Sequence, residues 1–209
     1  YEIKSGSWST GTSLGKIKGT SFKVGTIPTG TTSQIFSIKA FDADGNQSVN
    51  AAQISLTITA PSAPQNGTGT FSDDNLILKW DAPASGSYAI EDYEIYQGAI
   101  SNANLLGRSK STTFQLPVTF NSNQTFNIRA VDIAGNTGTA LSFTVNFVLA
   151  QAPNISYQYE NSQLKLSWVV PVVGSTKIKE YEIKQSATSV TDAGLATFIT
   201  RVSSTSFLL

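Results

Sequence analysis

The sequence predicts an all-β chain, built from β-sandwiches that follow one another in a string. Its apolar residues form short alternating runs such as "NLILKW" and "FNIRAV", which are separated by turn-forming residues. The phrase "YEIKSGSW" at the start of the chain returns as "YEIYQGAI" at 93 and as "YEIKQSAT" at 181. A repeat of about ninety residues is the size of one β-sandwich and too long for one turn of a solenoid.

The landmarks of the repeat keep their spacing and indicate three copies. Trp80 and Tyr93 are 13 residues apart, as are Trp168 and Tyr181. Because the chain opens on the Tyr that begins the third strand, we expect the first copy to lack its first two strands. The predicted modules are residues 1–60, residues 61–149, which form a complete copy, and residues 150–209, which lack the last two strands.

The middle copy can be followed strand by strand. Apolar residues alternate in its second and sixth strands, so that Trp80 and Phe126 each lie on a core-facing side. A turn is expected at 134–136, where "AGN" interrupts the alternation. The predicted strands cover 67–72, 75–80, 90–98, 105–110, 111–117, 124–132 and 139–148.

Large aromatic residues at repeated positions are the predicted core of the sandwiches. Trp8 is different because it follows the first strand closely, where a loop aromatic could stack on a sugar ring. The corresponding position holds Ile100 in the second copy and lies near Val190 in the third. Packing over the sandwich edge is therefore favoured for Trp8, with surface contact as the alternative. The predicted core residues are Trp80, Trp168, Tyr1, Tyr93, Tyr181, Phe36 and Phe126.

Composition excludes several classes of function. Fourteen basic residues balance fourteen acidic ones, so the chain lacks the positive charge that nucleic-acid binding requires. No apolar run approaches the ~20 residues of a membrane-spanning helix. Without Cys or His, neither a disulfide framework nor the usual metal ligands and general bases are present. We therefore expect no catalytic residues, no metal site and no cofactor.

Two sets of acidic residues invite a functional interpretation. Asp42, Asp44 and Asn46 match the first, third and fifth positions of a calcium loop, but the required Gly and the final Glu are missing. A turn with Gly45 and Asn46 at positive φ is favoured, and a calcium site is the alternative.

The second set recurs with the module and comprises Glu2, Glu94 and Glu182; the basic residues Lys39 and Arg129 also recur. Alternation predicts solvent-facing side chains that pair across strands.

The residues "LILKWDAP", "YEIYQG" and "FNIRAVDIAGNTG" resemble the fibronectin type III module, which is an immunoglobulin-like sandwich. In the first copy, "YEIKSGSWSTGTSLGKIKGTSFKV" and "FSIKAFDADGNQS" are similar to the fibronectin-type repeats of tailed-phage tail-tip (host-specificity) and tail-fibre proteins. Modules that end in "AVDxAGN" also occur in bacterial adhesins and polysaccharide-degrading enzymes. The loop "SVTDAGLAT" (189–197) in the third copy departs most from the family pattern.

The phage resemblance implies a structural protein of the virion, located in the tail tip or a tail fibre, that contributes to host attachment as a non-catalytic spacer. Its implied partners are other tail proteins, further copies of itself in a homotrimer, and a host receptor or glycan. The alternatives are a non-catalytic spacer in a secreted bacterial polysaccharide-degrading enzyme and a bacterial surface adhesin. These would place the protein outside the cell or on the cell surface.

Overall fold

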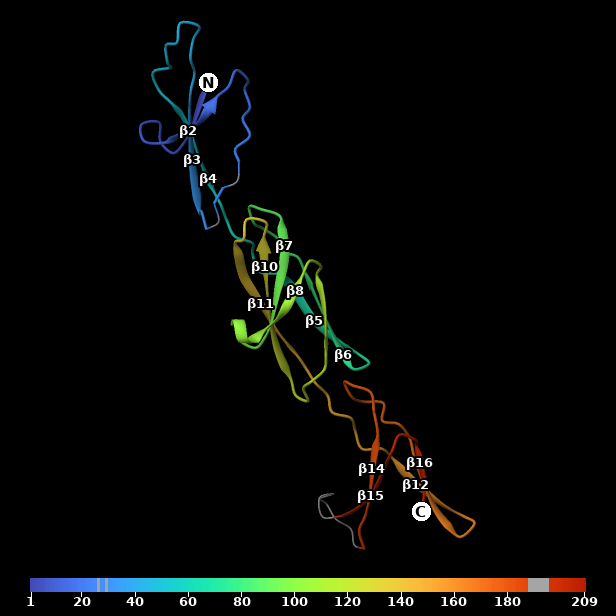
Figure 1. Cartoon of the computed structure of the whole chain (residues 1–209). Helices are drawn as coiled ribbons and strands as arrows, with labels where there is room; N and C mark the ends of the chain where they lie inside the picture. The colour runs from blue at the N-terminus through green and yellow to red at the C-terminus, as the bar shows by residue number, and fades with distance from the viewer. Residues whose placement is uncertain (26, 29, 188–195) are drawn as a thin grey trace. The chain divides into compact units, whose positions relative to one another are not determined.

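The computed structural model describes residues 1–25, 27–28, 30–187 and 196–209 and is all-β (Figure 1). In this described part, sixteen strands form several antiparallel sheets, and a single 3₁₀ turn covers Asn102–Asn104. The fold-class prediction, fibronectin type III-like sandwiches, is confirmed. No helix in the described ranges is long and apolar enough to cross a membrane. Most of the 189–197 loop lies outside the described residues.

The first sheet has the strand order β2-β1-β3-β4. Its strands are β1 (Glu2–Ser5), β2 (Thr12–Lys16), β3 (Ser33–Lys39) and β4 (Ala52–Thr57). Ile3 of β1 and Phe36 of β3 are buried, as the alternation requires. Tyr1 was predicted to lie in the core, but it is 45% exposed.

The exposure of Tyr1 contrasts with the tyrosines at the equivalent positions of the two other copies. In the two other copies, a Trp thirteen residues earlier covers the equivalent tyrosine: Trp80 covers Tyr93 and Trp168 covers Tyr181.

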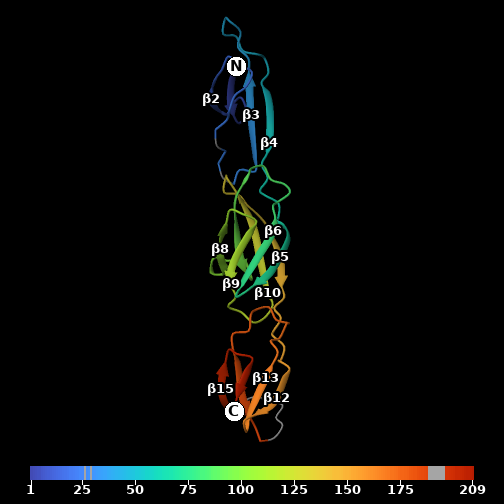
Figure 2. The same cartoon turned by 90° about the vertical axis from the view of Figure 1, so that its right-hand side faces the viewer.

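Seven strands in the middle of the chain form two sheets, with orders β5-β6-β9 and β11-β10-β7-β8 (Figure 2). All seven strands expected between residues 61 and 149 are present. The three-stranded sheet contains β5 (Gln65–Ser72), β6 (Asn75–Asp81) and β9 (Thr113–Pro117). The four-stranded sheet contains β7 (Ile90–Gln97), β8 (Leu105–Ser109), β10 (Gln124–Asp132) and β11 (Thr137–Val145).

These strands supply the largest fully buried apolar side chains in the described residues. Leu76, Leu78, Phe126 and Ile128 have no exposed surface, and Trp80 is 3% exposed. The Trp80 ring meets the ring of Tyr93 edge-on at 5.3 Å between centroids. Such pairs join the strands of a sandwich through both buried area and ring geometry.

A glycine permits a second close approach. A Cβ added at Gly69 would lie 2.4 Å from Cγ2 of Val145, a distance that real Cβ atoms do not reach. The sequence uses Gly here because the Val145 side chain of strand β11 occupies the space that a Cβ on β5 would need.

The last five strands form a three-stranded sheet, β12-β13-β16, and a pair, β14-β15. Trp168 is 8% exposed and its ring lies 5.1 Å from that of Tyr181, which is half-buried. The contact repeats the Trp80–Tyr93 pair of the middle strands. The strands are β12 (Ile155–Glu160), β13 (Gln163–Trp168), β14 (Tyr181–Gln185), β15 (Thr197–Val202) and β16 (Ser206–Leu208).

Packing of the backbone divides the residues into two compact units. One contains residues 1–67, 80–112 and 126–143, and the other contains residues 68–79, 113–125 and 144–209. The three-module division at residues 60 and 149 stays a prediction.

Candidate functional site

A network of charged side chains on the outer face of the four-stranded sheet is the most elaborate polar site in the described residues. Its centre is Glu94, the third acidic residue of strand β7. Antiparallel register places Arg129 of β10 directly opposite Glu94 on one side and Arg108 of β8 on the other. Asp92 and Tyr96 share this face because they lie two residues before and after Glu94.

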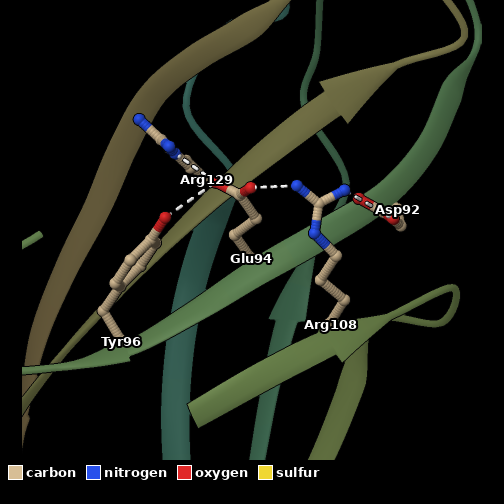
Figure 3. A network of polar contacts seen from close by, with 5 residues as sticks. All are labelled: Asp92, Glu94, Tyr96, Arg108 and Arg129. Carbon is tan, nitrogen blue, oxygen red and sulfur yellow. Dashed lines mark hydrogen bonds and ion pairs between the residues drawn. The ribbon is translucent and has the colours of Figure 1, made fainter. Parts of the chain in front are cut away.

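Both carboxylate oxygens of Glu94 accept hydrogen bonds (Figure 3). Arg129 Nε donates to Oε2 at 2.5 Å, and the Tyr96 hydroxyl donates to the same oxygen at 2.8 Å. Oε1 accepts from Nη2 of Arg108, whose Nη1 also pairs with Asp92 at 3.3 Å. The network therefore joins three adjacent strands through their side chains.

Burial of this carboxylate corrects the expectation that Glu94 faces solvent. Its side chain is only 6% exposed, whereas the side chains of Arg129 and Arg108 are 28% and 53% exposed. The arginines and the Tyr96 ring cover the carboxylate, and the Arg129 guanidinium lies 5.5 Å from the centre of that ring. Cross-strand pairing, the other half of the expectation, is present.

The electrostatics of the network favour the ionised form of Glu94. Burial alone raises the pKa of this carboxyl, but hydrogen bonds from Tyr96 and Arg129 and the charges of both arginines outweigh it, so that the pKa falls below its ordinary value. Burial and the bond to Glu94 raise the pKa of the Tyr96 phenol. A carboxylate held in this way is a poor proton acceptor, so the site is suited to joining strands and not to acid–base chemistry.

The equivalent glutamates behave differently in the two other sheets. Glu182 is paired with Arg201 at 2.8 Å and with Lys184 at 3.0 Å, and hydrogen bonds from both hold its pKa below the ordinary value. Glu2 lies opposite Lys16 and Lys39 in register, yet neither ammonium reaches ion-pair distance from it in the described structure. Of these three glutamates, Glu94 is the one that is buried and bonded to arginines on both neighbouring strands.

Trp8 folds back toward the outer face of the first sheet and is half-buried. Lys4 Nζ lies 4.6 Å from the centre of its rings and also donates a hydrogen bond to its carbonyl oxygen at 3.0 Å. Lys39 Nζ approaches the same rings at 5.5 Å. Trp8 thus lies against the charged side of this sheet, opposite Ile3 and Phe36.

The "DADGN" stretch forms a turn held by its own carboxylate. Asp42 Oδ1 accepts from the backbone N–H groups of Asp44 and Asn46, and Oδ2 accepts from the Asn46 side chain. The side-chain and backbone hydrogen bonds from Asn46 lower the pKa of Asp42. Gly45 has the expected positive φ of 87°.

The prediction of a positive φ at Asn46 is wrong, because the φ of this residue is not positive. Its amide instead bonds to Asp42, which holds the turn without a left-handed residue at position 46. Asp132 forms the same turn in the next copy and is fully buried. No cluster of three acidic ligands for a metal occurs among the residues that the structure describes.

Sequence reasoning found two members of the charged network and missed three. Glu94 and Arg129 stood out because they recur with the module. Asp92, Tyr96 and Arg108 were not among the predicted residues. Arg108 had a usable signal: it lies fourteen residues after Glu94, as Lys16 does after Glu2.

Comparison with known proteins gives partial similarities. No family model matches the sequence. Exoglucanase B of Cellulomonas fimi is 26% identical over 208 residues, covering 90% of this chain and 19% of that protein. Chitinase A1 of Niallia circulans is 27% identical over 185 residues, covering 83% of this chain and 25% of that protein. The chain therefore spans a quarter or less of the length of these curated relatives.

Solved structures with similar folds match parts of the chain. Domains d3–d4 of the rat CD45 extracellular region have a TM-score of 0.39 and 11% identity, covering 62% of this chain and 70% of that one. The FN3tt mut protein has a TM-score of 0.34 and 19% identity, covering 42% and 97%. The spore cortex lytic enzyme SleM of Clostridium perfringens has a TM-score of 0.36 and 16% identity, covering 50% and 35%.

Proposed function

We propose that residues 1–209 are a non-catalytic spacer of fibronectin type III-like sandwiches within a longer, secreted polysaccharide-degrading protein. The observation that carries this proposal is the pattern of similarity. Two proteins named for action on polysaccharides align with most of this chain, while the chain covers only 19% and 25% of them. A shared segment of that size suits an accessory region that connects other domains.

The chemistry of the charged network supports a non-catalytic role. Glycoside hydrolysis needs two carboxyl groups flanking the substrate, one of which stays protonated because its pKa is raised. The pKa of Glu94 is instead lowered, and Arg108 binds both Glu94 and the neighbouring Asp92. Both carboxylates are therefore committed to holding strands together.

A spacer exchange tests this role. The chain would be placed between a cellulase catalytic domain and a cellulose-binding domain, with an equally long Gly/Ser linker as the matched control. Flexible Gly/Ser linkers behave as random coils, whereas folded sandwiches keep their dimensions. We expect faster hydrolysis of insoluble cellulose with the sandwich spacer and equal rates on a soluble substrate. Equal rates on both substrates would remove the spacer proposal.

A second candidate is a spacer in the tail tip or a tail fibre of a phage. It rests on the motif pair of the first copy, "YEIKSGSW" and "IKAFDADGNQS". The two curated relatives bear names of enzymes and lend it no support. Immunogold labelling with antibody against residues 61–149 separates the candidates: gold at one end of phage tails supports this one, and labelled culture medium supports the secreted protein.

A further inference from the structure

The outer face of the first sheet carries a cluster of lysines and aromatic rings that we call the lysine face. It comprises Lys4, Lys16, Lys39, Trp8 and Phe41. Register places Lys16 and Lys39 on either side of Glu2, with Lys4 two residues farther along the same strand. Three cations thus surround one carboxylate on this side of the sheet.

The ammonium groups lie against aromatic rings and backbone carbonyls. Lys4 and Lys39 both approach the Trp8 rings, at 4.6 and 5.5 Å, and Lys16 lies 4.5 Å from the centre of the Phe41 ring. Lys39 also donates a hydrogen bond to the carbonyl of Val49 at 3.1 Å. These partners are neutral, and none of the three ammonium groups forms an ion pair in the part of the chain that the structure describes.

The middle sheet shows what the same positions do when their charge is compensated. There, both arginines that flank Glu94 are bonded to it, and the carboxylate is buried. In the first sheet, the flanking lysines form no ion pair with Glu2 among the described residues. An incoming carboxylate would therefore meet cations that can leave weak cation–π contacts for stronger charge-assisted hydrogen bonds.

We propose that the lysine face binds a carboxylated polysaccharide, with sugar rings against Trp8 and carboxylates on the three ammonium groups. A half-buried indole that cations leave on ligand binding offers an apolar surface for the C–H face of a sugar. Nucleic acid suits the face less, because three lysines in a chain of zero formal net charge provide few phosphate contacts.

Titration of the whole chain with an oligogalacturonate, followed by tryptophan fluorescence and calorimetry, tests the proposal. Trp80 and Trp168 are 3% and 8% exposed, so a change in emission reports on Trp8. A neutral cello-oligosaccharide and single-stranded DNA of equal length serve as competing ligands. We expect saturable binding of the oligogalacturonate, weakened by added salt, and no saturation with the two others.

Variants locate the binding surface. Lys16→Gln and Lys39→Gln should each weaken binding by about twofold to fivefold, the range for exposed ion pairs. Trp8→Ala should weaken binding measured by calorimetry, which does not depend on the indole signal. Lys110→Gln is the control variant. It removes an exposed charge that lies outside the lysine face, directly after strand β8, and should leave the affinity for the oligogalacturonate unchanged.

The proposal would be overturned if the oligogalacturonate did not bind, if DNA bound as tightly, or if Lys110→Gln weakened binding as much as Lys16→Gln and Lys39→Gln. The binding surface does not depend on the spacer role, so the two proposals can fail separately.

Discussion

Replacing Arg129 with Met tests the account of the charged network most sharply. The variant keeps an apolar stem over the sheet but removes the Nε–H that bonds to the Glu94 carboxylate at 2.5 Å. Breaking a buried ion pair by removing one partner costs about 3–5 kcal/mol of unfolding free energy. Because Arg108 and Tyr96 remain bonded to Glu94, we expect a loss of about 2–3 kcal/mol in this case.

Thermal unfolding by circular dichroism measures this loss. For a cooperative unit of 60–100 residues, it corresponds to a melting midpoint lower by about 8–24 °C. Arg201→Met, which removes the exposed partner of Glu182, should hardly move the midpoint. The double variant Glu94→Leu with Arg129→Met should recover much of the stability, because no unpaired carboxylate is left buried.

The pH dependence of the effect follows from the lowered pKa of Glu94. A carboxyl whose pKa is lower in the folded chain than in the unfolded chain stabilises the fold above its unfolded pKa of about 4.3, and this contribution is lost as the pH falls through the folded value. The gap between the parent chain and Arg129→Met should therefore narrow in acid. Equal midpoints for Arg129→Met and Arg201→Met, or a gap that widens in acid, would refute the reasoning.

Three further tests of the packing and the turns use the same measurement. Gly69→Val should lower the unfolding free energy by about 1–3 kcal/mol through overpacking. Gly19→Ala should be nearly neutral, because a Cβ at this position meets nothing within 4 Å. Equal losses of unfolding free energy for the two variants would contradict the close packing at Gly69. Asp132→Ala should cost about 1–3 kcal/mol because part-buried backbone N–H groups lose this acceptor, and a smaller loss is expected for Asp42→Ala, where the turn is exposed. The reverse order would argue against that role. Trp80→Ala should cost about 3–5 kcal/mol, and an unchanged midpoint would mean that this ring is not a core anchor.

The sequence was sufficient to predict the strands and the core of the middle sheets. Alternation and repeat spacing fixed which side of each strand is apolar, and Trp80 and Phe126 are buried accordingly. The same rule misjudged Glu94, because alternation assigns a side chain to a face without saying what covers that face. Two arginines and a tyrosine from three strands cover this carboxylate, and their convergence depends on strand order and register.

Local chemistry explains the other differences. Tyr1 was predicted to be buried from its repeated position; at the same position in the later copies, a tryptophan ring packs against the tyrosine. At the "DADGN" turn, composition indicated a turn correctly, while the backbone angle of Asn46 depended on a hydrogen bond that the sequence alone does not reveal. The lysine face likewise became visible only when register brought Lys16 and Lys39 to the two sides of Glu2.

The proposed spacer role requires that residues 1–209 do not themselves cleave polysaccharides. The most direct measurement is the release of reducing ends from cellulose, chitin and polygalacturonate incubated with residues 1–209 alone. The account predicts no release above the buffer blank on any substrate. Release that rises in proportion to the concentration of the chain, and that persists through further purification, would contradict it.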